Sequence, residues 1–410
     1  MTPRHLRATA LALATGLMVA ACSSATESGE RVDPADWPAV LEEADGQTVS
    51  WYMFGGDETL NTFVDDVVTP RLAEQGVTLQ QVRITDTAEA VNTVLGEKQA
   101  GRTEGGAVDA IWLNGENFAT GVQADIWACD WAEQLPNARY VELDDPSVAS
   151  DFGVPVNGCE AVWQQASSAL VYDFADLEAA DVASADSLLD WVRDNPGRFA
   201  YPAPPDFTGS MAVRQLLYAD IADPSRWAGA VEEEPYRAVA DPFWERLNAL
   251  EPSLWRGGET YPTSQDDVER LYADGEISAY FTYGPGAVGQ RVEDGVFPES
   301  TRQAVLAEGN IGNHSFIAIP ENAGSRAAAF VLANTLQEPE VQLALFESAG
   351  IYPGIDVSRT DDAVQQAFDD VPRSPSVLSL DDLTADVQPE LSSAYLARIE
   401  DDWTTLVLQQ

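Results

Sequence analysis

The stretch Ile111-Trp112-Leu113-Asn114-Gly115-Glu116-Asn117-Phe118 places a short apolar strand directly before a group of hydrogen-bonding side chains. In open α/β sheets, ligands bind just beyond the carboxyl ends of the strands, where helix N-termini point towards them. The sequence therefore predicts that Asn114, Glu116 and Asn117 face a ligand. A plainer interpretation is that Gly115 only makes a turn and that Asn117 caps the next helix.

Two strand–loop–helix units precede this stretch. Residues Val49–Phe54 predict a strand, and after Gly55-Gly56-Asp57 the apolar residues recur at helical spacing. Residues Thr78–Ile84 predict a second strand, and Asp86 with Glu89 has capping-box spacing before another helix. Strands that alternate with helices indicate a mostly parallel sheet, whose right-handed crossovers bring the loops after the strands to one edge. The glycine loop and the loop at 114–117 should therefore share a rim.

A second α/β series follows the strand predicted at residues 167–173. Further strands are predicted at Arg198–Tyr201, Ile277–Tyr283 and 314–319, and the loop from Pro202 to Ser210 ends at a helix N-cap. The fold class is therefore α/β with two lobes. Residues 47–166 with 315–350 are expected to form lobe 1, residues 167–314 lobe 2, and residues 351–410 a C-terminal helical segment that packs on the lobes. Ala169–Tyr172 and Phe316–Ile319 are expected to be hinge strands.

The N-terminus predicts export and a lipid anchor. Arg4 and Arg7 precede an apolar run that ends at Val19-Ala20-Ala21-Cys22, a pattern typical of a signal peptide at residues 1–21. Small residues directly before a cysteine resemble the bacterial lipobox, which implies that Cys22 is lipidated. Residues 22–46 are then expected to be the tether and the start of the body, on the extracytoplasmic face of the cell membrane. An ordinary secretory signal with a chance cysteine is the alternative.

Cysteine content and net charge limit which compartment and which partners are expected. Cys129 and Cys159 remain after Cys22, and an oxidising compartment favours a disulfide between them, with two buried thiols as the alternative. The chain has 68 acidic and 22 basic residues and a net charge of −46. Such a surface repels nucleic acid, so no nucleic-acid partner is expected.

Several enzyme and metal chemistries lack the residues that they need. After the predicted signal, His314 is the sole histidine, so it is expected to be a hinge or core residue and not part of a triad or metal site. The run Gly284–Gly289 matches the glycine pattern of dinucleotide-binding loops, but Pro285 removes a backbone N–H that would donate to phosphate. We therefore predict no cofactor and no metal site.

Aromatic side chains gather at predicted strand ends beside these polar loops. They are Trp51, Tyr52, Phe54, Trp112, Trp163, Phe207 and Tyr283. Aromatic faces next to carboxylates, without a basic residue in the same loops, suit a cationic organic ligand. Ordinary core packing is the alternative for any one of them, especially Tyr52 and Trp112. A second alternative is an exported glycoside hydrolase that uses paired carboxylates such as Glu116 and Asp206.

Four runs, together with the lipobox, resemble the YnjB-type solute-binding proteins of ABC importers. They are Trp51–Asp57, Asp109–Phe118, Asn195–Phe199 and Tyr201–Gly209. The resemblance implies a type II periplasmic-binding-protein fold, in which two α/β lobes joined by hinge strands close around a small-molecule solute. It also implies a protein that is not an enzyme and that delivers its solute to an ABC permease and ATPase. We expect a monomer that contacts the membrane only through its N-terminal lipid.

By position, the loops of this chain resemble the ligand-contacting loops of that class. The predicted ligand-binding residues are Trp51, Phe54, Gly55, Gly56, Asn114, Glu116, Asn117, Trp163, Asp206, Phe207, Thr208, Gly209 and Tyr283. Glu116 and Asp206 would pair with charge, the two asparagines would donate hydrogen bonds, and the aromatic side chains would form walls. Members of the wider class bind polyamines, thiamine, iron or oxyanions, so the resemblance does not name the ligand.

Overall fold

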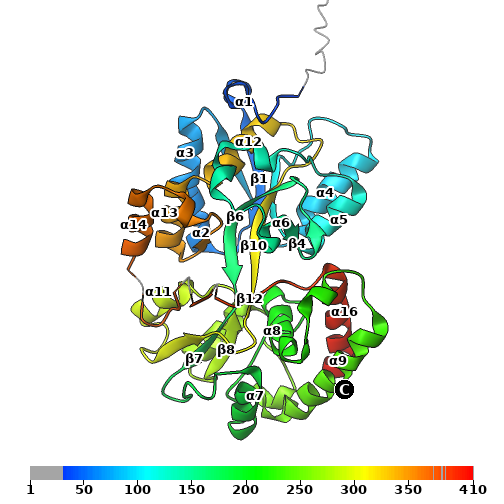
Figure 1. Cartoon of the computed structure of the whole chain (residues 1–410), viewed down its shortest axis with the longest axis vertical. Helices are drawn as coiled ribbons and strands as arrows, with labels where there is room; N and C mark the ends of the chain where they lie inside the picture. Colours follow the sequence, from blue (N-terminus) through cyan, green and yellow to red (C-terminus); the bar gives the residue numbers. More distant parts are fainter. Residues whose placement is uncertain (1–30, 373, 380–381, 384, 410) are drawn as a thin grey trace, which may run out of the picture.

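The computed structural model of the chain describes residues 31–372, 374–379, 382–383 and 385–409. The predicted signal peptide, Cys22 and the tether up to Gly29 lie outside the described residues. Two bodies, each a β-sheet with helices on both faces, lie one above the other in Figure 1. We call the body built on the larger sheet lobe 1 and the other lobe 2. Within the described ranges, no helix combines the length and apolar character that a membrane crossing requires.

Lobe 1 is built on a seven-stranded sheet with the order β11-β6-β10-β3-β1-β2, and β12 pairs with β10. Its strands are β1 (Thr48–Phe54), β2 (Thr78–Ile84), β3 (Ala110–Leu113), β6 (Glu160–Ser167), β10 (Asn310–Ala318), β11 (Tyr352–Pro353) and β12 (Val387–Gln388). β1 is parallel to β2 and β3, whereas β10 is antiparallel to β3. The first three predicted strands are confirmed, and the carboxyl ends of β1 and β3 lie at one edge as expected.

Helices cover both faces of this sheet. They are α1 (Trp37–Ala44), α2 (Glu58–Phe63), α3 (Thr69–Glu74), α4 (Ala88–Gln99), α5 (Glu116–Ala124), α6 (Pro146–Ala149), α12 (Arg326–Leu336), α13 (Pro339–Ala349) and α14 (Asp362–Asp370). A hairpin of β4 (Ser150–Asp151) and β5 (Val154–Pro155) adjoins them. The predicted capping box before α4 is wrong, because Thr87 is the N-cap and Glu89 accepts a hydrogen bond from Thr85 (2.9 Å).

Lobe 2 is built on the three-stranded sheet β8-β7-β9. Its elements are β7 (Ala169–Asp173), β8 (Ala279–Thr282), β9 (Thr301–Ala304), α7 (Ala185–Asp194), α8 (Phe207–Leu217), α9 (Glu233–Leu250), α10 (Gln265–Ala273), α11 (Ala287–Glu293) and α16 (Ser393–Trp403). The strand predicted at Arg198–Tyr201 is wrong, since Phe199 forms one isolated bridge to Ala279. Gly197 before this segment and the Pro202–Pro205 run after it limit the pairing, because proline has no N–H to donate.

The two crossing strands, β6 and β10, are antiparallel neighbours that run from the lobe 1 sheet towards lobe 2 in Figure 1. β6 continues into β7 through Ser168, whose backbone N–H donates to Ile311 O (2.7 Å). Of the expected hinge strands, Ala169–Tyr172 pairs within the lobe 2 sheet and Phe316–Ala318 within the lobe 1 sheet, and their part in lobe rotation stays a prediction. The chain passes between the lobes at Ser167–Ser168 and at Asn310–Asn313, where β10 still pairs with β6 and β12.

The segment after α13 makes a third connection between the lobes. β11 pairs with β6, α14 packs against α13, and β12 pairs with β10 at Asn310 and Ile311. α16 then packs in lobe 2 against α8. Elsewhere, Cys129 and Cys159 form a disulfide that ties the irregular segment after α5 to the residue before β6. His314 is buried in β10, where its Nδ1 lies 3.2 Å from Ser147 O.

Candidate functional site

The glycine loop after β1 forms part of the lobe 1 rim. Phe54 exposes 44% of its surface there. A Cβ on Gly56 would lie 2.3 Å from Cζ of the Phe54 ring, and a Cβ on Gly55 would lie 2.5 Å from Cβ of Arg83. Gly55 therefore lets the neighbouring strand approach the backbone, whereas a side chain at Gly56 would displace the exposed Phe54 ring.

The loop after β3 forms the adjoining part of the rim. Gly115 has φ +63° and is the N-cap of α5, so Asn117 lies in the first helical turn and the alternative that Asn117 caps the helix is wrong. The N–H of Gly115 donates to Asp151 Oδ2 (2.7 Å) on β4. Glu116 is exposed, and Asn114 and Asn117 are half-buried. The structure thus places these polar side chains together at the predicted edge.

The two predicted tryptophan walls lie inside lobe 1 instead. Trp51 and Trp163 are both 0% exposed and belong to one hydrophobic cluster. Their ring centroids lie 5.6 Å apart in an edge-to-face arrangement, and Trp112 packs edge-to-face on Trp163 at 5.3 Å. The prediction of ligand-wall roles for Trp51 and Trp163 is therefore wrong, because both rings point into the layer between the sheet and its helices.

The lobe 2 side is formed where α8 begins and β8 ends. Phe207 exposes 45% of its surface, and its ring stacks on that of Tyr283 with centroids 5.0 Å apart. Asp206 is the N-cap of α8 and accepts from the N–H of Gly209 (2.9 Å), so its carboxylate already has a structural role. Burial raises the pKa of Asp206. Thr208 and Gly209 are buried within the first turn, so the aromatic pair is the accessible part of this side.

Carboxylates of the two lobes influence one another. Burial raises the pKa of Glu400 on α16, the hydrogen bond from Ser210 and the charge of Arg214 oppose this, and the negative charge of Glu116 in lobe 1 adds to the increase. Burial likewise raises the pKa of Glu269 on α10, which is ion-paired with Arg291 (2.6 Å) and is only slightly affected by Asp57 of lobe 1. A cation beside Glu116 and Glu400 would relieve the repulsion between them.

Two fully buried carboxyl groups lie behind the rim. Asp151 and Glu160 are 2% and 3% exposed. Burial raises the pKa of Asp151 to about 7, against the hydrogen bond from Gly115, and the charge of Glu390 adds to the increase. Burial also raises the pKa of Glu160 well above its usual value, and the charge of Asp151 raises it further. Sequence analysis missed both groups, since nothing in their neighbourhood marks them as buried.

Arg214 is a second omission: the loops contain no basic residue, but this base lies behind them on α8. It is buried on α8, and its Nη2 lies 2.9 Å from Glu390 Oε2. A signal was available, because the α8 stretch is apolar or small apart from Arg214 and Gln215. A helix that is apolar on all sides is buried. The negative charge of Glu390 nevertheless balances the positive charge of Arg214. Arg214 therefore does not reverse the acidic character of the region.

Backbone contacts join the lobes on two sides of the crossing strands. A Cβ on Gly286 in lobe 2 would lie 1.8 Å from the carbonyl oxygen of Gly350, which follows α13 in lobe 1. A Cβ on Gly153 in the β4–β5 hairpin would lie 2.4 Å from the carbonyl oxygen of Ala228 in lobe 2. The lobes can approach this closely only because glycine occupies both positions.

Replacing Gly286 by alanine is expected to open the lobes. Gly286 has φ −64°, so alanine is not strained locally and acts only through its Cβ. That contact must widen by roughly 1–2 Å to restore van der Waals separation. Electron–electron double resonance between spin labels at Glu43→Cys in lobe 1 and Glu245→Cys in lobe 2 measures the interlobe distance. It should be longer in the Gly286→Ala protein than in the protein that keeps Gly286.

Gly96→Ala is the matched control, because a Cβ there meets no atom within 4 Å. Its interlobe distance should equal that of the unsubstituted protein. An unchanged distance in the Gly286→Ala protein as well would show that the contact between Gly286 and Gly350 does not limit the approach of the lobes.

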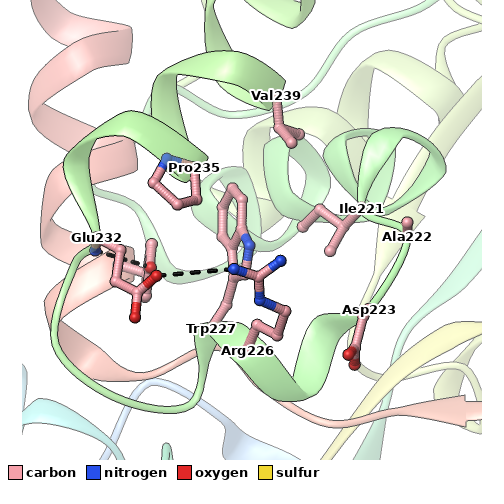
Figure 2. A pocket seen from close by; sticks show the side chains of 9 residues that line it. Ile221, Ala222, Asp223, Arg226, Trp227, Glu232, Pro235 and Val239 are labelled. Carbon is pink, nitrogen blue, oxygen red and sulfur yellow. Dashed lines mark hydrogen bonds and ion pairs between the residues drawn. The ribbon is translucent and has the colours of Figure 1, made fainter.

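A pocket in lobe 2 lies apart from this region (Figure 2). Its lining includes Trp227 and Tyr395, whose rings stack with centroids 4.6 Å apart, and the pair Arg226–Glu232 at 3.8 Å. The Glu232 N–H donates to the Tyr395 hydroxyl (3.0 Å), which joins the start of α9 to α16. No predicted ligand-binding residue lines this pocket, so it is separate from the rims described above.

Comparisons with known proteins agree on one family. A family model described as bacterial extracellular solute-binding protein matches residues 67–369. Over 309 residues, the chain is 38% identical to Protein YnjB of Escherichia coli (strain K12), and the match covers 75% of this chain and 79% of that protein.

Two solved structures resemble the fold at low sequence identity. An ABC transporter structure from Clostridium perfringens ATCC 13124 has a TM-score of 0.63 and 15% identity, and the match covers 88% of this chain and 99% of that chain. The spermidine/putrescine ABC transporter substrate-binding protein PotD from Streptococcus pneumoniae strain Canada MDR_19A has a TM-score of 0.58 and 14% identity. That match covers 88% of this chain and 98% of PotD.

Proposed function

Because the chain belongs to the family of bacterial extracellular solute-binding proteins, we propose that it captures a small cationic organic solute between its two lobes. Its fold is the two-lobed type II periplasmic-binding-protein fold. The solute would then pass to the permease and ATPase of an ABC importer. The protein would be held at the extracytoplasmic face of the cell membrane by a lipid on Cys22, as the lipobox predicts.

One observation supports the cationic solute above the others. Both lobes contribute a carboxylate, Glu116 from the rim of lobe 1 and Glu400 from α16 of lobe 2, and the charge of Glu116 raises the pKa of Glu400. Beside them, the stacked rings of Phe207 and Tyr283 offer a partly exposed aromatic face. An organic cation would gain charge pairing with the first group and cation–π attraction from the second. Similarity to PotD shows a shared fold and does not add to this argument.

The residues expected to contact the solute are those of the two rims. They are Phe54, Gly55, Gly56, Asn114, Glu116 and Asn117 from lobe 1, and Phe207 and Tyr283 from lobe 2. Asp206, Thr208 and Gly209 would act through the cap that fixes the start of α8. The alternative of a glycoside hydrolase with paired carboxylates has less support, because one of its two carboxylates, Asp206, already caps a helix.

A thermal-denaturation panel tests the proposal. Putrescine, spermidine, thiamine and glycine betaine are each added at equal ionic strength, with malate and phosphate as anions for comparison. A ligand present at 100 times its Kd adds about 2.7 kcal/mol of stability, which raises Tm by several degrees. We expect at least one cation to do so. Stabilisation by anions alone would contradict the proposal.

Three variants distinguish binding at the site from weak binding of cations to the acidic surface as a whole. Phe207→Ala and Glu116→Gln should each remove most of the cation-dependent rise in Tm. Phe174→Ala is the matched control, because Phe174 is 53% exposed in lobe 2 but lies after β7, away from the rims. Equal shifts in all three proteins would mean that the cation binds the general surface.

A further inference from the structure

Three buried side chains and the half-buried Tyr283 meet where lobe 2 joins the crossing strands. We call Arg214, Tyr283, Asn313 and Glu390 the hinge cluster. Nη2 of Arg214 donates to Oε1 of Glu390 (3.1 Å) and lies 2.9 Å from Oε2, with which it forms an ion pair. Asn313 Nδ2 donates to the same Oε1 (3.1 Å), and so does the hydroxyl of Tyr283. The Tyr283 hydroxyl also accepts from Arg214 Nη2 (3.2 Å).

Each member of the cluster comes from a different element. Arg214 lies on α8, Tyr283 directly follows β8, Asn313 lies in β10 where that strand leaves lobe 1, and Glu390 follows β12. One carboxylate therefore links lobe 2 to a crossing strand. Because hydrogen bonds to a charged acceptor in a buried site are strong, movement of one partner is transmitted to the others.

α8 makes a second contact with the crossing point. Gln215, next to Arg214, accepts from the Ser168 hydroxyl (2.8 Å) and from the N–H of Ile311 (3.0 Å). The same helix begins at Phe207, which stacks on Tyr283. Both rings of the aromatic pair are thus attached to elements that hold β10.

We propose that Arg214 and Glu390 are positioning residues that join the aromatic pair Phe207–Tyr283 to crossing strand β10. When a solute displaces the aromatic pair, the strand then bends with it. The role of the aromatic pair in this statement rests on the proposed function. The link between Tyr283 and β10 rests instead on the hydrogen bonds that Tyr283 and Asn313 both donate to Glu390.

Tyr283→Phe is the variant that isolates this link. It keeps the ring that stacks on Phe207 and removes only the hydroxyl that reaches Glu390. Amide hydrogen exchange of the 310–314 segment should become about five-fold faster, as expected for the loss of one net hydrogen bond. Tyr280→Phe is the matched control, because Tyr280 lies on β8 and its buried hydroxyl has no hydrogen-bond partner in the structure. Exchange in the control should be unchanged.

A double-mutant cycle distinguishes coupling from general loosening. Asn313→Leu removes a second of the three donors to Glu390 Oε1 and should have a similar effect alone. Since both side chains act through one oxygen, the double variant should exchange about five-fold faster and not about 25-fold faster. Effects that multiply, or an unchanged rate in Tyr283→Phe, would overturn the proposal.

A binding measurement tests the solute-dependent part. For any cation of the panel that binds at the rims, Tyr283→Phe should weaken affinity about five-fold although the ring is retained, and Tyr280→Phe should leave it unchanged. Equal affinity in the unsubstituted and Tyr283→Phe proteins would overturn this part. If no cation binds, the proposed function fails, while the exchange experiment still decides whether the cluster joins Tyr283 to β10.

Discussion

Replacing Arg214 by methionine is expected to lower the free energy of unfolding by about 3–5 kcal/mol. The side chains of Arg214 and Glu390 are 1% and 3% exposed. Methionine fills much of the volume but leaves the Glu390 carboxylate buried without its cation. Burial opposes the charge of Arg214, but Glu390 together with Tyr283, Tyr218 and Glu400 outweighs burial, and the pKa of the guanidinium is raised. Urea denaturation followed by tryptophan fluorescence measures the loss.

Two further variants give this prediction its controls. Arg237 forms exposed ion pairs with Glu233 and Asp241 on α9, so Arg237→Met should change stability little. The double variant Arg214→Met/Glu390→Leu removes both charges and should recover a large part of the loss, because no unpaired charge stays buried. A single variant as stable as the unsubstituted protein would mean that Glu390 reaches solvent or takes up a proton at no cost.

Asp151→Asn is expected to change the pH dependence of stability. Burial raises the pKa of Asp151 to about 7 in the folded protein, whereas in the unfolded chain it is about 3.9. Between these values the folded state holds a proton that the unfolded state has released, so stability falls as pH rises from about 4 to 7. The full difference is on the order of 4 kcal/mol. The variant, which has no such proton to lose, should be more stable than the unsubstituted protein at pH 8.

Denaturation at pH 5 and pH 8 measures this effect. The difference in stability between the two pH values should be smaller in Asp151→Asn than in the unsubstituted protein. Some pH dependence should remain, because burial also raises the pKa of Glu160. Asp190→Asn alters an exposed carboxylate on α7 and should leave the pH dependence unchanged. An equal dependence in all three proteins would show that Asp151 is ionised in the folded state.

The aromatic residues show how much of the candidate site could be predicted from local sequence patterns. Phe54, Phe207 and Tyr283 lie at the rims as predicted from their positions after strands or at a helix start, although whether they touch a solute stays a prediction. Trp51 and Trp163 were given the same role from the same pattern and are core residues. Alternation along a strand places side chains on two faces, but which face another layer covers depends on helices distant in sequence.

Charged residues show the same limit. Glu116 was placed at the rim from its strand-end loop, and it lies there. Asp206 was expected to pair with a solute, yet it accepts a hydrogen bond from its own helix. Glu390 and Glu400 lie in the C-terminal segment, which returns to the crossing strands and to lobe 2. Their neighbours are set by long-range packing that leaves no periodic pattern in the sequence.

For this chain, the sequence alone determined the α/β class, the first three strands, the shared edge after β1 and β3, and the family. These follow from short-range periodicity, turn residues and characteristic runs, which act over a few neighbouring positions. The tertiary structure alone decided which tryptophans are core, where the strands cross between the lobes, and which carboxylates lie buried. Those features depend on residues far apart in the chain that meet only after folding. Burial also arises only at that stage, and it sets the charge state of Asp151 and makes Arg214 depend on Glu390.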